Sequence, residues 1–244
     1  MTERPTPTIS IITATYNAAE HLPRLIESLA AQTDQDFEWV VADGGSTDGT
    51  LEILETAKLQ LNNVVVDSRP DFGIYDALNR GVKKSKSDFY VVLGADDELL
   101  PQAVNVFKKE CNKENTDLIS FKFHVDDRIS NIREPRWEFL FSQFAHVTGH
   151  AVGLLIRKSL HEKNGYYSRI LPIAADQLFI LSSIRNGAKV SESNSIVGRF
   201  SIEGVSNTDP VGALTEIFRV NVLLGHNYYI QLLLLILRLI KNKK

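Results

Sequence analysis

Short apolar runs alternate with amphipathic stretches along the first 110 residues of the chain. The runs are rich in Val and Ile and are bounded by polar residues, which is typical of buried strands of a parallel sheet. Between them, apolar residues recur every three or four positions, as Leu22, Leu25 and Leu29 do, and this spacing predicts helices. The predicted strands cover 8–14, 37–42, 64–67 and 89–93, and the predicted helices cover 18–32, 50–61 and 74–84.

Strands that alternate with helices at this spacing predict an α/β fold, with a mostly parallel central sheet and helices on both faces. The second half is less regular, with a predicted helix over 176–184. Its predicted strands cover 118–125, 152–157, 189–193 and 196–201. No internal repeat or low-complexity linker divides the chain.

Polar or acidic residues follow three of the first four predicted strands, at 15–17, 43–48 and 96–97. In a parallel sheet, ligands bind beyond the carboxyl ends of the strands. Asp96 and Asp97 come directly after an apolar run, and two carboxylates there suit a divalent cation held against phosphates. The alternative for this pair is to stabilise the amino end of the next helix.

Composition narrows the class of protein. The 244 residues are 43% hydrophobic and 23% charged, as in an ordinary globular protein. The net charge of −3 provides no basic field, so no nucleic-acid partner is expected. The single cysteine, Cys111, excludes an internal disulfide and suits a reducing cytoplasm. Residues 1–7 are polar and contain prolines, so we expect no signal peptide and a cytoplasmic location.

The last fifteen residues differ from this average. A strongly apolar run at 230–240 ends in the basic segment 241–244. The run is too short to span a bilayer. It predicts a terminal helix that either lies on an anionic membrane surface, as a peripheral contact, or packs on its own domain or a second subunit.

Five motifs, in their order and spacing, resemble family 2 glycosyltransferases of the GT-A fold. They are T-A-T-Y-N at 13–17, V-V-A-D-G-G-S-T-D-G-T at 40–50, D-F-G-I-Y-D-A-L-N-R-G at 71–81, G-A-D-D at 94–97 and I-A-A-D-Q-L at 173–178. Within this family, the chain is similar to the bacterial branch that builds surface polysaccharides such as O-antigen and capsule. The resemblance implies an inverting transfer of a hexosyl or N-acetylhexosaminyl group. The expected donor is a UDP-sugar, and the expected acceptor is a hydroxyl of a lipid-linked oligosaccharide or polysaccharide precursor.

The resemblance also implies a domain organisation. Residues 1–205 form the expected GT-A domain, with a nucleotide-binding half at 1–110 and an acceptor half at 111–205. Residues 206–244 form a C-terminal helical extension that ends in the terminal helix.

Nucleotide-binding roles follow from the same resemblance. Thr15 and Tyr16 match the loop that packs along the base. Asp43 matches the aspartate that accepts a hydrogen bond from the uracil ring, a charge-assisted bond. Asp71 and Gly73 match the loop on the other side of the base. Capping of the following helix is the alternative for Asp43, and a turn is the alternative for Gly73.

Asp97 matches the metal ligand of the family's D-x-D motif, and Asp96 would face the ribose or share the metal. The implied cofactor is Mn²⁺ or Mg²⁺, which bridges the diphosphate. Gly94 stands where many relatives carry a first aspartate, so the chain has fewer carboxylates here.

A second departure lies in the motif at 71–81. Leu78 stands where many relatives carry an arginine. The loop contact of that arginine is therefore either absent or supplied by Arg80 or Arg69.

Asp176 matches the catalytic base. Direct inversion needs a carboxylate that takes the proton of the acceptor hydroxyl as its oxygen attacks the anomeric carbon. The alternative for Asp176 is an N-cap of the helix that follows it. His150 matches a histidine at the floor of the acceptor or diphosphate region, and a structural role is its alternative.

Other classes fit less well. A nicotinamide dehydrogenase needs G-x-G-x-x-G after the first strand, and this chain has T-Y-N-A-A-E at 15–20. A sugar nucleotidyltransferase needs a glycine-rich loop and a lysine at the same turn. The remaining alternative is a catalytically degenerate GT-A protein that acts as a binding or scaffolding module, and Gly94 is the one residue that favours it.

Overall fold

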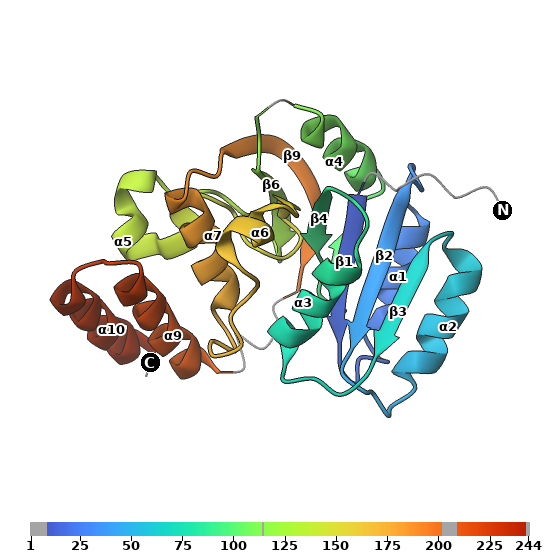
Figure 1. Ribbon diagram of the computed structural model, residues 1–244, viewed down its shortest axis with the longest axis horizontal. Coiled ribbons are helices and arrows are strands. Elements are labelled where there is room, and N and C mark those ends of the chain that lie inside the picture. The colour runs from blue at the N-terminus through green and yellow to red at the C-terminus, as the bar shows by residue number, and fades with distance from the viewer. Residues whose placement is uncertain (1–8, 114, 202–208, 243–244) are drawn as a thin grey trace.

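The computed structural model describes residues 9–113, 115–201 and 209–242. In the first half, strands and helices alternate as predicted (Figure 1). The elements are β1 (Ile9–Thr15), α1 (Leu22–Ala30), β2 (Phe37–Asp43), α2 (Thr50–Gln60), β3 (Val64–Ser68), α3 (Ile74–Lys84), β4 (Phe89–Val92), β5 (Glu98–Leu99) and α4 (Ala103–Cys111). Helix α1 begins four residues later than predicted, since the Ala18 amide donates to Thr50 Oγ1 and Pro23 lies in the first helical turn, where its missing N–H costs least.

The second half adds further helices and four further strands. The elements are β6 (Leu118–Val125), β7 (Arg128–Ile129), η1 (Pro135–Trp137), α5 (Glu138–Phe141), η2 (Ser142–Ala145), β8 (Leu154–Arg157), α6 (Leu160–Asn164), α7 (Ala175–Arg185), β9 (Val190–Phe200), α9 (Pro210–Leu223) and α10 (Tyr228–Asn242). The prediction of two strands at 189–193 and 196–201 was wrong. Both belong to β9, which stays paired with β6 through two register shifts, and such bulges place an unpaired polar residue within a continuous strand.

One nine-stranded sheet runs through the described part of the molecule. Eight strands follow the order β3-β2-β1-β4-β8-β6-β9-β5, and β7 pairs with β6 at the side. Strands β3, β2, β1 and β4 are mutually parallel, and β8 then pairs antiparallel with β4. The predicted α/β class, with a sheet between helices, is confirmed.

The register of the parallel strands brings three polar residues into one row. Thr15 is opposite Asp43 in the β1–β2 pair, and Asp43 is opposite Ser68 in the β2–β3 pair. Each of the three is the last residue of its strand. Parallel pairing therefore places side chains that are far apart in sequence at one edge of the sheet.

Two apolar cores cover the two faces of the sheet. One contains side chains of α1, α2 and α4, including Leu25, Leu54 and Phe107. The other contains side chains of α3, α6, α7 and α9, including Leu78 and Phe179. Because α3 and α7 share the second core, packing fixes the loops that precede these two helices relative to each other.

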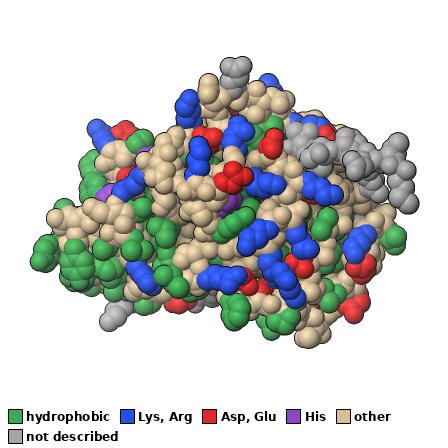
Figure 2. Space-filling model, viewed as in Figure 1, with side chains coloured by type: hydrophobic (Ala, Val, Ile, Leu, Met, Phe, Trp, Pro, Cys, Tyr) green, Lys and Arg blue, Asp and Glu red, His purple; other side chains and the backbone are tan. Residues whose placement is uncertain are grey.

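The last two helices, α9 and α10, pack against each other at one end of the molecule (Figure 1). In the described residues, no helix is both long and apolar enough to cross a bilayer. Large apolar side chains on α9 and α10 are exposed, and green side chains gather over this end in Figure 2. They are Val211, Leu223, Tyr228, Tyr229, Ile230, Leu233, Ile236, Leu237 and Ile240. The predicted domain boundary at 205/206 lies outside the described residues, as do Lys243 and Lys244 of the basic end.

Candidate active site

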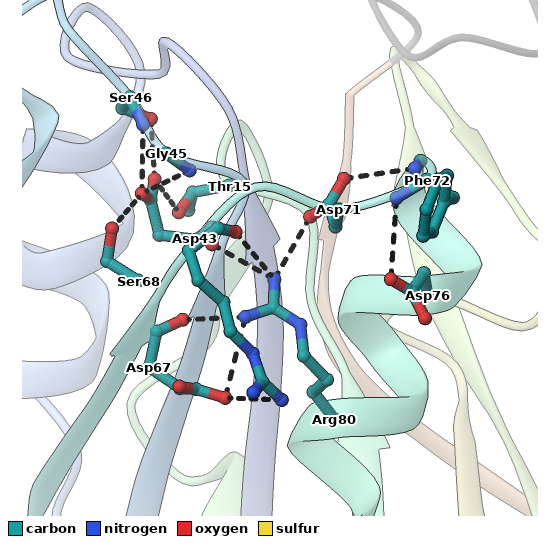
Figure 3. Close-up of polar contacts among 12 residues, drawn as sticks. Thr15, Asp43, Gly45, Ser46, Asp67, Ser68, Asp71, Phe72, Asp76 and Arg80 are labelled. Carbon is teal, nitrogen blue, oxygen red and sulfur yellow. Dashed lines mark hydrogen bonds and ion pairs between the residues drawn. The ribbon is translucent and has the colours of Figure 1, made fainter.

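Asp43 is the centre of a buried hydrogen-bond cluster at the ends of β1, β2 and β3 (Figure 3). Its carboxylate, 0% exposed, accepts from Thr15 Oγ1 at 3.0 Å and from Ser68 Oγ at 2.7 Å. It also accepts from the amides of Gly45 at 2.9 Å and Ser46 at 3.0 Å, and from the Ser46 hydroxyl. Burial opposes ionisation, but the bonds from Ser46, Ser68 and Gly45 outweigh it and hold the pKa of Asp43 below its usual value. Asp43 is therefore an anion that organises the loop after β2.

These five donors fill the acceptor positions that a carboxylate offers. A contact between Asp43 and a nucleotide base would require one of the five to leave. The side chains that do face outward nearby belong to the flanking loops. Tyr16 is 68% exposed, and a Cβ added to Gly44 would lie 3.2 Å from its ring and 3.0 Å from Asp71 Oδ2. Glycine at position 44 thus lets Tyr16 and Asp71 approach from two sides.

Arg80 ties this cluster to the loop after β3 (Figure 3). Its guanidinium forms a 3.0 Å ion pair with Asp71 and donates to the backbone carbonyls of Asp43 at 3.0 Å and Asp67 at 3.1 Å. Arg80 is 8% exposed, whereas Arg69 has an exposed side chain and only a 3.8 Å ion pair with Asp67. The arginine contact expected at this loop is therefore made by Arg80.

The loop from Asp71 to Gly73 forms a tight turn before α3. Asp71 Oδ1 accepts from the Gly73 amide at 3.0 Å, and Asp76 accepts from the Phe72 amide at 3.3 Å. Gly73 has a φ of +105°, which disfavours any residue with a Cβ. Phe72 is 85% exposed, and the sequence analysis did not single it out. The sequence signal for Phe72 was its position between Asp71 and Gly73, two residues predicted to bind the nucleotide.

A basic hollow lies beside α3. It is lined by Asp67, Arg69, Pro70, Asp76, Arg80, Lys83, Lys84 and Arg169. None of the site residues predicted from the sequence lines it. Arg80 connects the hollow with the candidate site, because it lines the hollow and also donates to the backbone carbonyl of Asp43.

Asp96 and Asp97 form a turn after β4, and the two carboxylates have different surroundings. Asp97 is 1% exposed and accepts from the amides of Gly94 at 2.7 Å and Ser201 at 3.0 Å. Burial raises the pKa of Asp97 to about 7. Asp96 is partly exposed, and its backbone carbonyl accepts from Arg24 at 3.2 Å. Asp97 thus holds the turn together, while Asp96 is the more exposed of the two residues.

The predicted assignment of Asp97 as the metal ligand stays a prediction: Asp97 is enclosed here, and the partly exposed Asp96 is the more accessible of the two carboxylates. The geometry of the turn also explains Gly94. A Cβ at position 94 would lie 2.6 Å from Asp96 Oδ1 and 3.0 Å from Asp97 Oδ2, so an aspartate here would displace both carboxylates. In the described residues, no group of three or more His, Cys, Asp or Glu could hold a metal. One or two carboxylates are nevertheless enough for a cation that is also bound by substrate phosphates.

Asp176 lies in the first turn of α7, with a side chain 14% exposed. Its Oδ1 is 2.8 Å from the Tyr75 hydroxyl, and its Oδ2 is 3.7 Å from Nδ1 of His150. The N-cap of α7 is Ala174, without a side-chain cap, so the structure contradicts the alternative that Asp176 is the N-cap. The structure brings Asp176 and His150 together, as the sequence alone did not.

Glu216, on α9, takes the place of a capping residue at the start of α7. It accepts from the amides of Ile173 at 2.9 Å and Ala174 at 2.8 Å. These amides precede Asp176 by three and two positions. Glu216 could not be predicted as a site residue, since nothing local in the sequence connects position 216 with position 174.

Comparisons with known proteins agree with this geometry. The Glycosyl transferase family 2 model matches residues 10–172. The chain is 45% identical over 94 residues to a PGL/p-HBAD biosynthesis glycosyltransferase of Mycobacterium bovis, a match that covers 38% of this chain and 37% of that relative. The chain therefore spans well under two thirds of that relative's length.

Two solved structures are similar in fold. One is S. aureus TarS 1-349 in complex with UDP-GlcNAc, with a TM-score of 0.70 and 21% identity, covering 93% of this chain and 70% of that one. The other is the mannosyltransferase PcManGT from Pyrobaculum calidifontis in complex with GDP-Man and Mn²⁺, with a TM-score of 0.68 and 14% identity, covering 97% and 75%. The α/β fold described above is shared with both structures and is the GT-A fold predicted from the sequence.

Proposed function

The chain belongs to glycosyl transferase family 2, and from this premise we propose that it is an inverting glycosyltransferase with Asp176 as its base. The observation that carries the proposal is the place of Asp176. It is a partly exposed carboxylate on the first turn of α7, held by Tyr75 and facing His150. A carboxylate held in this way is suited to take a proton from an acceptor hydroxyl.

In the proposed reaction, the hydroxyl oxygen of the acceptor bonds to the anomeric carbon of the donor. The bond between that carbon and the diphosphate oxygen breaks, and its electron pair leaves with the nucleoside diphosphate. The proton passes to Asp176. Attack from the face opposite the leaving group inverts the anomeric carbon.

The proposed donor is a UDP-sugar that carries a hexosyl or N-acetylhexosaminyl group. Its base would lie between the exposed Tyr16 ring and the turn at Asp71 and Gly73, with Thr15 and Asp43 holding the loops beneath it. The UDP-GlcNAc bound to TarS supports uracil, whereas the GDP-Man bound to PcManGT makes the base worth testing directly.

The proposed cofactor is Mn²⁺ or Mg²⁺, with Asp96 as the carboxylate that reaches it and Asp97 as the residue that fixes the turn. When bound, such a cation neutralises charge on the leaving diphosphate. The partly exposed Asp96 carboxylate, at the end of a parallel strand, fits an ion that takes its other ligands from phosphate and water. Mn²⁺ in the PcManGT complex is consistent with this assignment.

The proposed acceptor is a lipid-linked glycan at the inner face of the cytoplasmic membrane, reached by a peripheral contact through α10. Tyr229 is 78% exposed, Leu233 is 58% exposed and Ile240 is 60% exposed on this helix. Exposed apolar patches of this kind mark interaction surfaces.

The first test is thermal shift of the purified chain with UDP, GDP and dTDP, each with and without Mn²⁺, because a ligand that binds only the folded state raises the melting temperature. A metal-dependent shift with UDP, followed by transfer from a panel of UDP-sugars, supports the proposal. Asp176→Asn should keep the nucleotide shift and lose transfer by about 10²-fold or more. Near-normal transfer by Asp176→Asn would reject Asp176 as the base. No shift with any nucleotide would favour the degenerate binding module.

The membrane contact has its own test. Leu233→Gln combined with Leu237→Gln should reduce sedimentation with vesicles of anionic phospholipid. The matched control is Leu59→Gln, since Leu59 is 88% exposed on α2, away from this surface. Equal sedimentation of all three proteins would contradict a membrane contact through α10.

A further inference from the structure

Four buried side chains, His161, Tyr90, Tyr167 and His150, form a continuous hydrogen-bonded chain, and its last member, His150, lies beside the candidate base. His161 Nδ1 lies 3.0 Å from the Gly165 carbonyl oxygen. His161 Nε2 lies 2.7 Å from the Tyr90 hydroxyl, which lies 2.6 Å from the Tyr167 hydroxyl. The Tyr167 hydroxyl lies 2.8 Å from Nε2 of His150, whose Nδ1 faces Asp176 Oδ2 at 3.7 Å. We call His161, Tyr90 and Tyr167 the relay residues.

The surroundings of the chain keep its members in place and uncharged. Tyr90 is 0%, Tyr167 2%, His161 4% and His150 8% exposed. The His161 ring stacks on Phe179 at 4.2 Å between centroids. Burial lowers the pKa of His161 to about 4, lowers the pKa of His150 against the opposing effect of Asp176, and raises the pKa of both tyrosines. At neutral pH the chain therefore consists of two neutral imidazoles and two neutral phenols.

The donor and the acceptor of every hydrogen bond in this chain can be assigned, starting from the end at the Gly165 carbonyl. A carbonyl oxygen only accepts, so His161 Nδ1 carries the proton and its Nε2 accepts from Tyr90. The single Tyr90 proton is then used, so Tyr90 accepts from Tyr167. The Tyr167 proton is used in turn, so the remaining bond must be donated by His150 Nε2. Neutral His150 is thereby left with a bare Nδ1 that faces Asp176.

The tautomer of His150 decides its effect on the base. A proton on Nδ1 would donate to the Asp176 carboxylate, stabilise the anion and weaken it as a base. A bare Nδ1 does the opposite, because it repels the carboxylate and accepts from Asp176 once Asp176 is protonated. We propose that the relay residues lock His150 in its Nε2–H tautomer, so that Nδ1 of His150 and Oδ2 of Asp176 together hold the proton taken from the acceptor hydroxyl.

This inference rests on the proposed function in one respect, that Asp176 is the base. The acceptor oxygen bonds to the anomeric carbon, the bond from that carbon to the diphosphate oxygen breaks, and the proton goes to Asp176 Oδ2. The new carboxyl O–H then faces Nδ1 of His150 and donates to it once the 3.7 Å separation closes to hydrogen-bond distance. His150 thus acts on the proton after Asp176 has taken it, and His161, Tyr90 and Tyr167 are positioning residues.

The test combines one variant with a matched control. Tyr167→Phe removes the acceptor of His150 Nε2 and keeps the ring. The neighbouring Tyr166→Phe is the control, because Tyr166 is 45% exposed and its hydroxyl is outside the chain. The titratable groups that face the His150–Asp176 pair are Tyr75 from α3, Tyr90 from β4, His161 from α6, Tyr167 from the following loop and Glu216 from α9. All remain in place in the control.

The readout that does not depend on activity is the tautomer itself. Long-range ¹H–¹⁵N NMR of histidine-labelled protein separates Nδ1–H from Nε2–H imidazoles, and His150→Gln assigns the His150 signals among the six histidines. We expect Nε2–H for His150 and Nδ1–H for His161 in the wild type, and a gain of Nδ1–H at His150 in Tyr167→Phe alone. Two results would contradict the proposal that the relay residues fix the His150 tautomer. One is a wild-type His150 that carries its proton on Nδ1, and the other is a Tyr167→Phe spectrum equal to that of Tyr166→Phe.

The kinetic readout follows from the same argument. In Tyr167→Phe, kcat should fall about tenfold, a part of the usual effect of acid–base catalysis. The KM for the donor should not change, and the acidic limb of the pH profile of kcat should move to lower pH, because His150 then stabilises the carboxylate. A fall in kcat without movement of that limb would mean a structural role only. If the chain transfers no sugar, the proposed function fails, and the NMR measurement still decides the tautomer.

Discussion

The Glu216 carboxylate, on α9, accepts a hydrogen bond of 2.8 Å from the backbone amide of Ala174, the N-cap of α7. Through this bond the C-terminal helices take part in the candidate active site. Asp176 stands two positions after Ala174, so the segment that carries the base is fixed from outside the central sheet.

Glu216→Ala should therefore impair catalysis without weakening donor binding. Two backbone amides, of Ile173 and Ala174, lose their acceptor, which we expect to cost about 1–2 kcal/mol of stability. We expect kcat to fall and the thermal shift with UDP to persist, because the Asp43 cluster is a separate group. The controls are Glu216→Gln, which keeps a carbonyl acceptor, and Thr215→Ala at an exposed position of α9. A Glu216→Ala enzyme with unchanged kcat would show that this contact does not position Asp176.

Two single variants should distinguish the roles of the two carboxylates after β4. Asp96→Asn is expected to lose the Mn²⁺-dependent part of the UDP thermal shift, because Asp96 is the partly exposed partner. Asp97→Asn should keep the metal effect and unfold more easily by about 1–3 kcal/mol, since an amide group then faces the Gly94 or Ser201 amide. The reverse pattern, with the metal effect lost only in Asp97→Asn, would support Asp97 as the metal ligand.

Arg80 should be necessary for the loops that hold the nucleotide. Arg80→Met leaves Asp71 without its ion pair and the Asp43 and Asp67 carbonyls without a donor. Loss of one partner of a buried ion pair typically costs about 3–5 kcal/mol, and we expect a loss near that range in urea unfolding together with a weaker UDP shift. Arg69→Met is the matched control, and its exposed ion pair predicts a change below about 1 kcal/mol. Similar losses of stability in Arg80→Met and Arg69→Met would argue against Arg80 as the residue that holds these loops.

His161 should contribute a loss of stability on the acid side, and Asp97, whose pKa burial raises from 3.8 to about 7, should act in the opposite direction in the same pH range. Burial lowers the pKa of His161 from 6.5 to about 4, so between these values this residue binds more protons in the unfolded chain than in the folded one. The His161 contribution is complete above pH 6.5 and is lost as the pH falls toward 4. Linkage gives this His161 contribution as about 2 kcal/mol between pH 8 and pH 5, measured by urea unfolding as the difference between wild type and His161→Gln at the two pH values.

Two variants identify the origin of that pH dependence. His161→Gln should remove the His161 contribution and leave those of His150 and Asp97, whereas Tyr90→Phe should lower stability at every pH and retain all three, because burial and not the Tyr90 bond shifts the pKa of His161. If the free energy of unfolding of His161→Gln depends on pH as strongly as that of the wild type, the pH dependence belongs to other groups.

Much of the fold could be predicted because its signals are local. The structure gives α3 the predicted bounds of 74–84, since Gly73 forms the turn before it and the Ser85 backbone is extended after it. The prediction failed at β9, which was predicted as two strands at 189–193 and 196–201 and is one strand, Val190–Phe200. Pairing with β6 continues there through shifts of register, and a partner strand is not visible in a local pattern.

By itself, the sequence determined the alternation of strands and helices and the polar residues at the strand ends, because burial of one face leaves a periodic trace and parallel strands end at one edge. It also determined which acidic residues were candidates. Only the tertiary structure decided that Asp96 is partly exposed while Asp97 is enclosed, and that Arg80 supplies the loop contact. The structure alone showed the support of Asp176 by Glu216 and the bonding of Tyr90 to partners 71 and 77 positions away. Such choices depend on which distant side chains share one buried space, and no short-range pattern records that.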